Sequence, residues 1–205
     1  MRYRARVEYD GTDFAGFQVQ RGRRTVQGEL ERALAQLSAG RRVRVEAAGR
    51  TDAGVHATGQ VIAFTYRGRL SRGELERALD ALLPADIGVR PLQRTAADFR
   101  PRYRARYREY RYRIWNGPRS PLRERHALGV REPLDVAAMA AAAELFVGRH
   151  DFSAFGGWDE QPVRTLHRVD VRRSGRAVTI TVVGDAFLRQ MVRRLAAALL
   201  RVGRG

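Results

Sequence analysis

The stretch Gly49-Arg50-Thr51-Asp52-Ala53-Gly54-Val55-His56-Ala57-Thr58-Gly59-Gln60 joins two segments that are patterned as strands, 43–47 and 60–66. Its glycines allow the backbone to approach a ligand closely, and they leave one carboxylate, Asp52, on a strand-to-strand loop. Arg50, two residues earlier, can pair with that carboxylate or hold a phosphate. An ordinary turn in which Asp52 caps a local backbone amide is the alternative interpretation. This loop is the first candidate for a functional site.

The segments on either side of this loop predict the fold of the first half of the chain. Alternating apolar residues indicate strands, while Thr25 and the capping box Ser71-x-x-Glu74 each open a helix. The order β-α-β-β-α-β is a split βαβ unit of ferredoxin-like type, in which both helices lie on one face of an antiparallel sheet. The expected elements are a strand at 3–9 before the Asp10-Gly11 turn, a helix from Thr25 to Gly40, strands at 43–47 and 60–66, a helix from Ser71 to Pro84 and a strand at 87–92.

The second half of the chain repeats this order but lacks its last strand. We therefore expect an α+β protein of two ferredoxin-like units, 1–97 and 98–205, which share one antiparallel sheet with a central cleft. We also expect the chain to be short at its C-terminus, so that Leu188, Leu195 and Leu199 lose part of their cover. The predicted elements are strands at 103–115, 166–172 and 177–183, a helix at 135–147 and a final helix after Asp185.

Composition favours a globular protein that binds polyanions. The 205 residues include 39 basic side chains, all of them arginine, against 22 acidic ones, which gives a net charge of +17. A codon bias explains arginine in place of lysine but not the excess over acidic residues. The resulting field attracts nucleic acid first and an anionic membrane surface second. The hydrophobic content of 44% excludes disorder as the default class.

Several classes of site and location are disfavoured by what the sequence lacks. Without cysteine there is no disulfide scaffold, thiolate metal site or cysteine nucleophile. The longest apolar stretch, 136–147, is too short to cross a bilayer, and no signal-peptide run is visible, so we expect a cytoplasmic protein without membrane association. We predict no metal and no cofactor, because the four histidines lack the spacing of ligands. These are His56, His126, His150 and His167.

A basic and aromatic segment spans residues 100–125. It contains ten arginines, four tyrosines and Trp115, against the two acids Glu109 and Glu124. Arginine neutralises phosphates and aromatic rings stack on unpaired bases, a combination that suits structured RNA with an accessible loop. A solvated edge strand that is protected by its charge is the alternative.

The motifs of this chain resemble those of the tRNA pseudouridine synthase A family. The Gly49–Gln60 stretch is similar to the catalytic motif of that family, and the resemblance continues along the whole chain. Its further motifs are Glu8-Tyr9-Asp10-Gly11-Thr12, Gly16-Phe17-Gln18, Thr25-Val26-Gln27, Leu83-Pro84-x-Asp86-Ile87, Asp98-Phe99-Arg100-Pro101-Arg102-Tyr103, Tyr110–Asn116, Asp151–Phe155 and Ala186–Arg193. The closing Gly-Leu-Tyr-type strand of the family is absent.

The resemblance implies a pseudouridine synthase fold and a set of site residues. Asp52 would attack the anomeric carbon of the target uridine or stabilise its positive charge. Tyr110 would stack on the base and is a candidate for removing the C5 proton, and Arg193 would pair with Asp52. Read without the motif, Tyr110 is an aromatic residue on a half-buried strand and Arg193 is a solvated arginine. Arg50 and Tyr110 are the candidate substrate-binding residues.

By this resemblance we expect a cofactor-free homodimer that isomerises uridine to pseudouridine at positions 38–40 of the tRNA anticodon stem-loop. A non-catalytic RNA-binding protein of ferredoxin-like fold is the rival hypothesis. Asp52 discriminates between the two, because a carboxylate at the centre of a basic cleft repels phosphate. A basic metal-dependent nuclease is a second rival, for which the sequence offers too few metal ligands.

Overall fold

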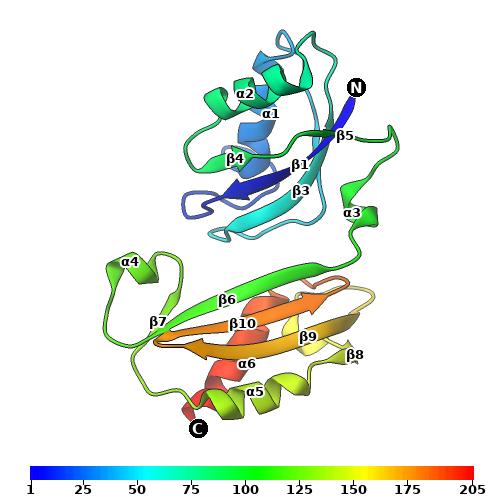
Figure 1. Cartoon of the computed structure of the whole chain (residues 1–205). Coiled ribbons are helices and arrows are strands. Elements are labelled where there is room, and N and C mark those ends of the chain that lie inside the picture. The colour runs from blue at the N-terminus through cyan, green and yellow to red at the C-terminus, as the bar shows by residue number, and fades with distance from the viewer. The chain divides into compact units, whose positions relative to one another are not determined.

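The computed structural model describes residues 1–205 as two compact units, Met1–Ala105 and Arg106–Gly205, each with its own sheet and core (Figure 1). Both are mixed α+β. The short helix α3 (Pro101–Arg104) belongs to the first unit, because it packs beside strands β2 and β3 and because the Arg2 guanidinium donates to the Phe99 carbonyl at 2.7 Å. The first unit therefore ends at Ala105.

The first unit is built around strand β1, whose two neighbours in the sheet come from different parts of the chain. The sheet order is β2-β3-β1-β4, all antiparallel, and β5 also pairs with β1. The inward-facing residues of β1 share one core with the apolar faces of helices α1 and α2. The elements are β1 (Arg2–Tyr9), α1 (Val26–Gln36), β2 (Val45–Ala47), β3 (Ala57–Thr65), α2 (Arg72–Leu82), β4 (Ile87–Val89) and β5 (Gln93–Arg94).

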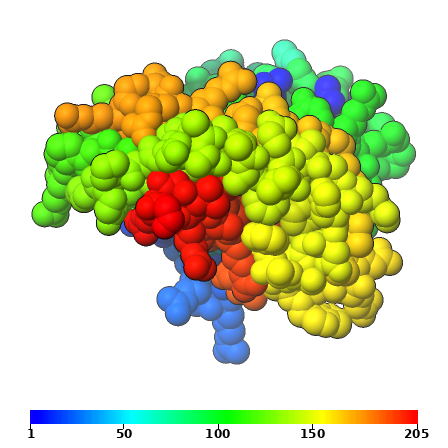
Figure 2. All heavy atoms as spheres, turned by 90° about the horizontal axis from the view of Figure 1, so that it is seen from below, coloured from blue at the N-terminus to red at the C-terminus, as the bar shows by residue number.

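The second unit has the sheet order β7-β6-β10-β9-β8. All its ladders are antiparallel except that between β6 and β7. Helices α5 and α6 pack against each other, and Figure 2 shows α6, in red, at the surface beside α5. The elements are β6 (Arg108–Asn116), α4 (Pro121–Glu124), β7 (Leu128–Val130), α5 (Val136–Glu144), β8 (Gly148–Asp151), the 3₁₀ turn η1 (Ser153–Phe155), β9 (Val163–Ser174), β10 (Ala177–Gly184) and α6 (Met191–Arg204).

The local start signals place the helices as expected. The Thr25 hydroxyl accepts the Gly28 N–H at 3.2 Å, and the capping box at Ser71 is complete in both directions. The strand expected over 103–115 begins only at Arg108, because Pro101 fixes a helical φ and opens α3. Six short elements escaped the sequence analysis, namely β5, α3, α4, β7, β8 and η1.

Three expectations about the sheets and the last helix are corrected. The strand ladders form two five-stranded sheets, one per unit, where we expected one shared sheet. Each sheet is therefore bounded by its own edge strands, among them the short strands β2 and β8. Leu188, Leu195 and Leu199 are at most 5% exposed, because they pack into the core of their own unit. The last helix begins at Met191, so Leu188 lies in the loop before it.

None of the helices combines the length and the apolar character that a transmembrane span requires.

Candidate active site

Asp52 lies on the loop between β2 and β3, and its side chain is exposed. Within the first unit its carboxylate makes no hydrogen bond or ion pair. The turn that follows is closed by the backbone alone, with the Asp52 carbonyl accepting the Val55 N–H at 3.2 Å. The alternative in which this carboxylate caps a local amide is therefore not what the structure shows. A carboxylate left without a structural partner is available for chemistry.

The residues just before Asp52 are held by bonds from three other parts of the chain. The Thr51 carbonyl accepts the Phe17 N–H at 3.0 Å. The Thr51 hydroxyl bonds the phenol of Tyr9 at 2.8 Å, at the buried end of β1. The Gln60 amide donates to the Gly49 carbonyl at 2.8 Å. These bonds fix where the Asp52 backbone lies while leaving its side chain exposed.

Two glycines let the loop after β1 lie directly on the backbone of the Asp52 loop. A Cβ on Gly11 would stand 2.1 Å from the Val55 carbonyl oxygen, and one on Gly16 would stand 2.7 Å from the Thr51 carbonyl oxygen. Gly16 also has a φ of +103°, which side chains disfavour. The glycines of the two N-terminal motifs are thus explained by contact with this loop.

Arg24 links the loop after β1 to Asp86, which precedes β4. Its guanidinium donates to both carboxylate oxygens of Asp86, at 2.7 and 3.0 Å, and its Cζ lies 4.2 Å from the ring centroid of Phe14. The hydrogen bond to Asp86 raises the pKa of Arg24, with the charges of Asp86 and Glu29 adding to the effect. The Phe14 carbonyl then accepts the Gly54 N–H at 3.3 Å. A continuous chain of contacts therefore links Asp86 to the Asp52 loop.

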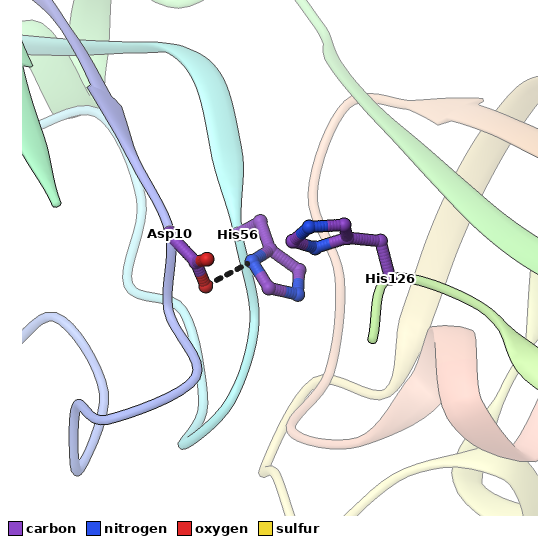
Figure 3. Close-up of side chains that lie close together, drawn as sticks. All are labelled: Asp10, His56 and His126. Carbon is purple, nitrogen blue, oxygen red and sulfur yellow. Dashed lines mark ion pairs between the residues drawn. The ribbon is translucent and has the colours of Figure 1, made fainter. Parts of the chain in front are cut away.

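His56 and Asp10 come together in this loop cluster, a contact that the sequence analysis missed (Figure 3). The His56 Nδ1 lies 3.0 Å from the Asp10 carboxylate and 3.0 Å from the backbone N of Gly11. Asp10 also accepts the Thr12 N–H at 3.0 Å, which is the bond expected for the Asp10-Gly11 turn. Both residues stand in motifs that the sequence analysis had quoted, so the motifs were the signal available for finding them.

Arg50, the proposed phosphate contact, is exposed and forms no ion pair with Asp52. The sequence left two roles open to Arg50, pairing with Asp52 or holding a phosphate, and the structure does not show the pairing. Its charge remains available to an anionic ligand.

Tyr110 lies in β6 of the second unit, opposite Val182 of β10, and is half-buried. Its ring meets Phe187 edge to face, with centroids 5.0 Å apart and planes at 80°. Phe187 follows Asp185, whose carboxylate accepts the Thr165 N–H at 3.2 Å and thereby ties this loop to β9. The Tyr110 ring is thus held at a defined angle, whereas Tyr103, for comparison, is 77% exposed.

Arg193 lies in the first turn of α6 and is exposed, while Met191 and Leu195 on the same helix are fully buried. The helical period therefore places Arg193 away from the core, as expected. Arg193 and Tyr110 belong to the second unit, and Asp52 and Arg50 belong to the first.

The two acidic residues of the basic segment 100–125 are neutralised locally. Glu109 bonds Arg111 at 2.7 Å and Arg168 at 3.4 Å. Glu124 accepts the Ser120 N–H and pairs with Arg131 at 2.9 Å, and these contacts lower the pKa of its carboxyl. Neither acid is left to repel a phosphate.

The chain is similar to tRNA pseudouridine synthases over nearly its whole length. The family model described as tRNA pseudouridine synthase matches residues 5–104 and 142–205. A tRNA pseudouridine synthase A from Geobacillus kaustophilus is 42% identical over 100% of this chain and 81% of its own length. The protein of the same name from Pelobacter propionicus is 45% identical over 97% of this chain and 83% of its own. The chain that carries this Asp52 loop belongs to the tRNA pseudouridine synthase family.

Proposed function

We propose that this protein isomerises uridine to pseudouridine in tRNA, with Asp52 as the catalytic carboxylate. One observation carries the proposal: Asp52 is exposed and without a partner in its own unit, on a backbone that three other segments hold in place. A binding module gains nothing from such a carboxylate in a protein of net charge +17. The family membership of the chain supports the same reaction.

The chemistry needs one carboxylate and one proton acceptor. Asp52 attacks the ribose C1′, or stabilises the positive charge there, as the C1′–N1 bond breaks and uracil leaves as an anion. The base turns and its C5 bonds to the same C1′; where Asp52 has bonded to C1′, that bond breaks in this step and the carboxylate is restored. The C5 proton is then removed while N1 gains one. We assign the removal of the C5 proton to Tyr110, whose ring Phe187 holds edge to face. Since uracil is stabilised as an anion, no second carboxylic acid is required.

The remaining assignments follow the family resemblance. We infer that Arg193 pairs with Asp52, that Arg50 holds a phosphate beside the target, and that the target lies at positions 38–40 of the anticodon stem-loop. We also infer a ferredoxin-like fold for each unit, which the sheet order β2-β3-β1-β4 supports for the first, and a cytoplasmic homodimer as the working form.

The decisive experiment follows tritium release from tRNA labelled at uridine C5. The wild-type protein should release tritium without changing the RNA length, and Asp52→Asn should reduce release to background while its affinity for tRNA stays unchanged. Asp13→Asn is the matched control, because Asp13 is an exposed aspartate of the neighbouring loop. Turnover by Asp52→Asn near the wild-type rate would refute the assignment. Loss of activity on chelation of divalent metal, with shortened RNA, would instead favour the nuclease.

A further inference from the structure

Four exposed arginines gather at the end of the first unit that is remote from Asp52. They come from the loop after β3, the start of α2 and strand β5, and they are Arg67, Arg69, Arg72 and Arg94. Arg67, Arg69 and Arg94 line an open surface pocket of about 350 Å³ together with Ser71 and the N-terminal residues, and Arg72 and Arg94 line a second, more open one of about 330 Å³. We call these four residues the β5 arginine surface.

The four arginines of the β5 arginine surface are not paired with an acid. None of its four guanidiniums makes an ion pair or a hydrogen bond in the structure, although other arginines of this unit, such as Arg24 and Arg90, bind carboxylates. The neighbouring acid Glu74 is engaged at the helix cap, where it accepts the Ser71 N–H at 2.8 Å. Guanidinium groups stay protonated at all physiological pH values, so four unpaired positive charges face the solvent beside the single negative charge of Glu74.

The backbone that carries this surface is fixed. The chain after β3 passes so close to the Tyr66 ring that a Cβ on Gly68 would stand 2.1 Å from the phenol oxygen. That phenol donates to the Leu37 carbonyl at 3.0 Å, and Tyr66 is only 3% exposed. Arg94 is held opposite Tyr3 by the ladder between β5 and β1. Arg94 and Arg72 thus lie in regular elements, and the loop that carries Arg67 and Arg69 packs on the buried Tyr66.

Strand β1 separates this surface from the candidate catalytic loop. Its first residues pair with Thr65 and Phe64 near the arginines, and its last residue, Tyr9, bonds Thr51 beside Asp52. Eight residues of antiparallel strand span about 23 Å at roughly 3.3 Å per step. A ligand that touches both ends of the sheet must therefore be an extended polyanion.

We propose that the β5 arginine surface binds backbone phosphates of the tRNA outside the anticodon stem-loop that carries the target uridine, an inference that rests on the proposed function. The planar fork of arginine matches phosphate oxygens, and such contacts fix the register of an RNA without reading its sequence. Nucleobase stacking is not part of the contact, because Tyr3 and Tyr66 at this surface are at most 3% exposed. The surface orients the substrate so that the reacting uridine meets Asp52.

The test compares Arg69→Gln/Arg94→Gln with Arg32→Gln/Arg90→Gln. The control pair also removes two exposed arginines of the first unit, but these bind Glu29 and Asp80. Binding is measured against salt concentration with full-length tRNA and with the isolated anticodon stem-loop. For full-length tRNA, the slope of log affinity against log salt should fall in magnitude by about 1.4–1.8 in the first variant, at 0.7–0.9 per lost phosphate contact. For the stem-loop it should not change.

An unchanged slope with full-length tRNA, an equal loss with the stem-loop, or an equal loss in the control variant would each overturn the proposal. So would a loss of binding to acidic phospholipid vesicles with intact tRNA binding, which would assign the surface to a membrane. Tritium release by the wild-type protein is measured in parallel. Because the binding readout does not depend on turnover, a failure of the proposed reaction is seen separately from a failure of this surface.

Discussion

Gly11→Ala should disable the candidate active site without touching a catalytic group. The new Cβ would lie 2.1 Å from the carbonyl oxygen and 2.5 Å from the carbonyl carbon of Val55. Ordinary contact needs about 3.4 Å or more, so one of the two backbones must move by roughly 1 Å, and neither is the end of a flexible side chain. Val55 closes the turn that begins at Asp52, so the shift displaces the carboxylate.

The expected cost is large for turnover and moderate for stability. A misplacement of about 1 Å lowers the rate of a positioned reaction by about 10²-fold. Overpacking of this kind costs about 1–3 kcal/mol of unfolding free energy. Tritium release gives the rate, thermal unfolding gives the stability, and tRNA affinity should stay near that of the wild type.

Gly59→Ala is the matched control, because a Cβ at Gly59, in the same motif, meets nothing within 4 Å. It should leave turnover unchanged and unfold at the wild-type temperature or slightly above it, since alanine restricts the unfolded chain. Wild-type turnover in Gly11→Ala would refute the idea that this contact positions Asp52. An equal loss of turnover in Gly59→Ala would show that the motif tolerates no side chain for some other reason.

Three further outcomes are expected. Tyr110→Phe should lower turnover while keeping tRNA affinity, because the ring that stacks remains and only the proton acceptor is lost; Tyr107→Phe, on an exposed tyrosine of the same segment, should change neither. The pKa of Glu74 is lowered by its hydrogen bonds at the cap of α2, so its ionised form stabilises the fold above the unfolded value near 4.5, and that contribution is lost as pH falls. The difference in unfolding temperature between Glu74→Gln and the wild type should accordingly vanish in acid, and a difference that persisted at pH 3 would contradict the cause. Leu195→Ala should cost about 2–5 kcal/mol of unfolding free energy, because Leu195 is fully buried. Val202→Ala, at a 42% exposed position of the same helix, should cost under about 1 kcal/mol. Equal losses in denaturant titrations would show that the core does not cover Leu195.

Much of the architecture was predictable because its signals are local. Thr25 and the Ser71–Glu74 capping box each satisfy backbone donors within three residues, so a short stretch of sequence is enough to predict where these helices begin. The alternation along β1 is equally local, since the side-chain period of a strand is two. The late start of β6 was also within reach, because Pro101 favours the first turn of a helix over the interior of a strand.

The cover of the last helix could not be predicted in the same way. The apolar stripe of α6 was visible in the sequence, and the missing strand suggested that Leu195 and Leu199 would be partly uncovered. In the structure both pack into the core of the second unit, which includes Met139 of α5 and Phe152. Which segments fill a given space depends on packing between distant parts of the chain, and periodicity carries no information about that.

The candidate site also has features that local sequence predicts and features that depend on contacts between distant segments. The sequence by itself determined that Asp52 stands on a glycine-rich loop between two strands, because glycine, turn and strand patterns are local, and its motifs identified the family. Only the tertiary structure decided what holds that loop. The bond of the Tyr9 phenol to Thr51, the bond of the Phe17 amide to Thr51 and the close approach of Gly11 to Val55 join residues 34 to 44 positions apart. These residues meet because β1 and β3 pair in one sheet. Such contacts arise from the folding of distant segments onto each other, and no window of sequence contains both partners.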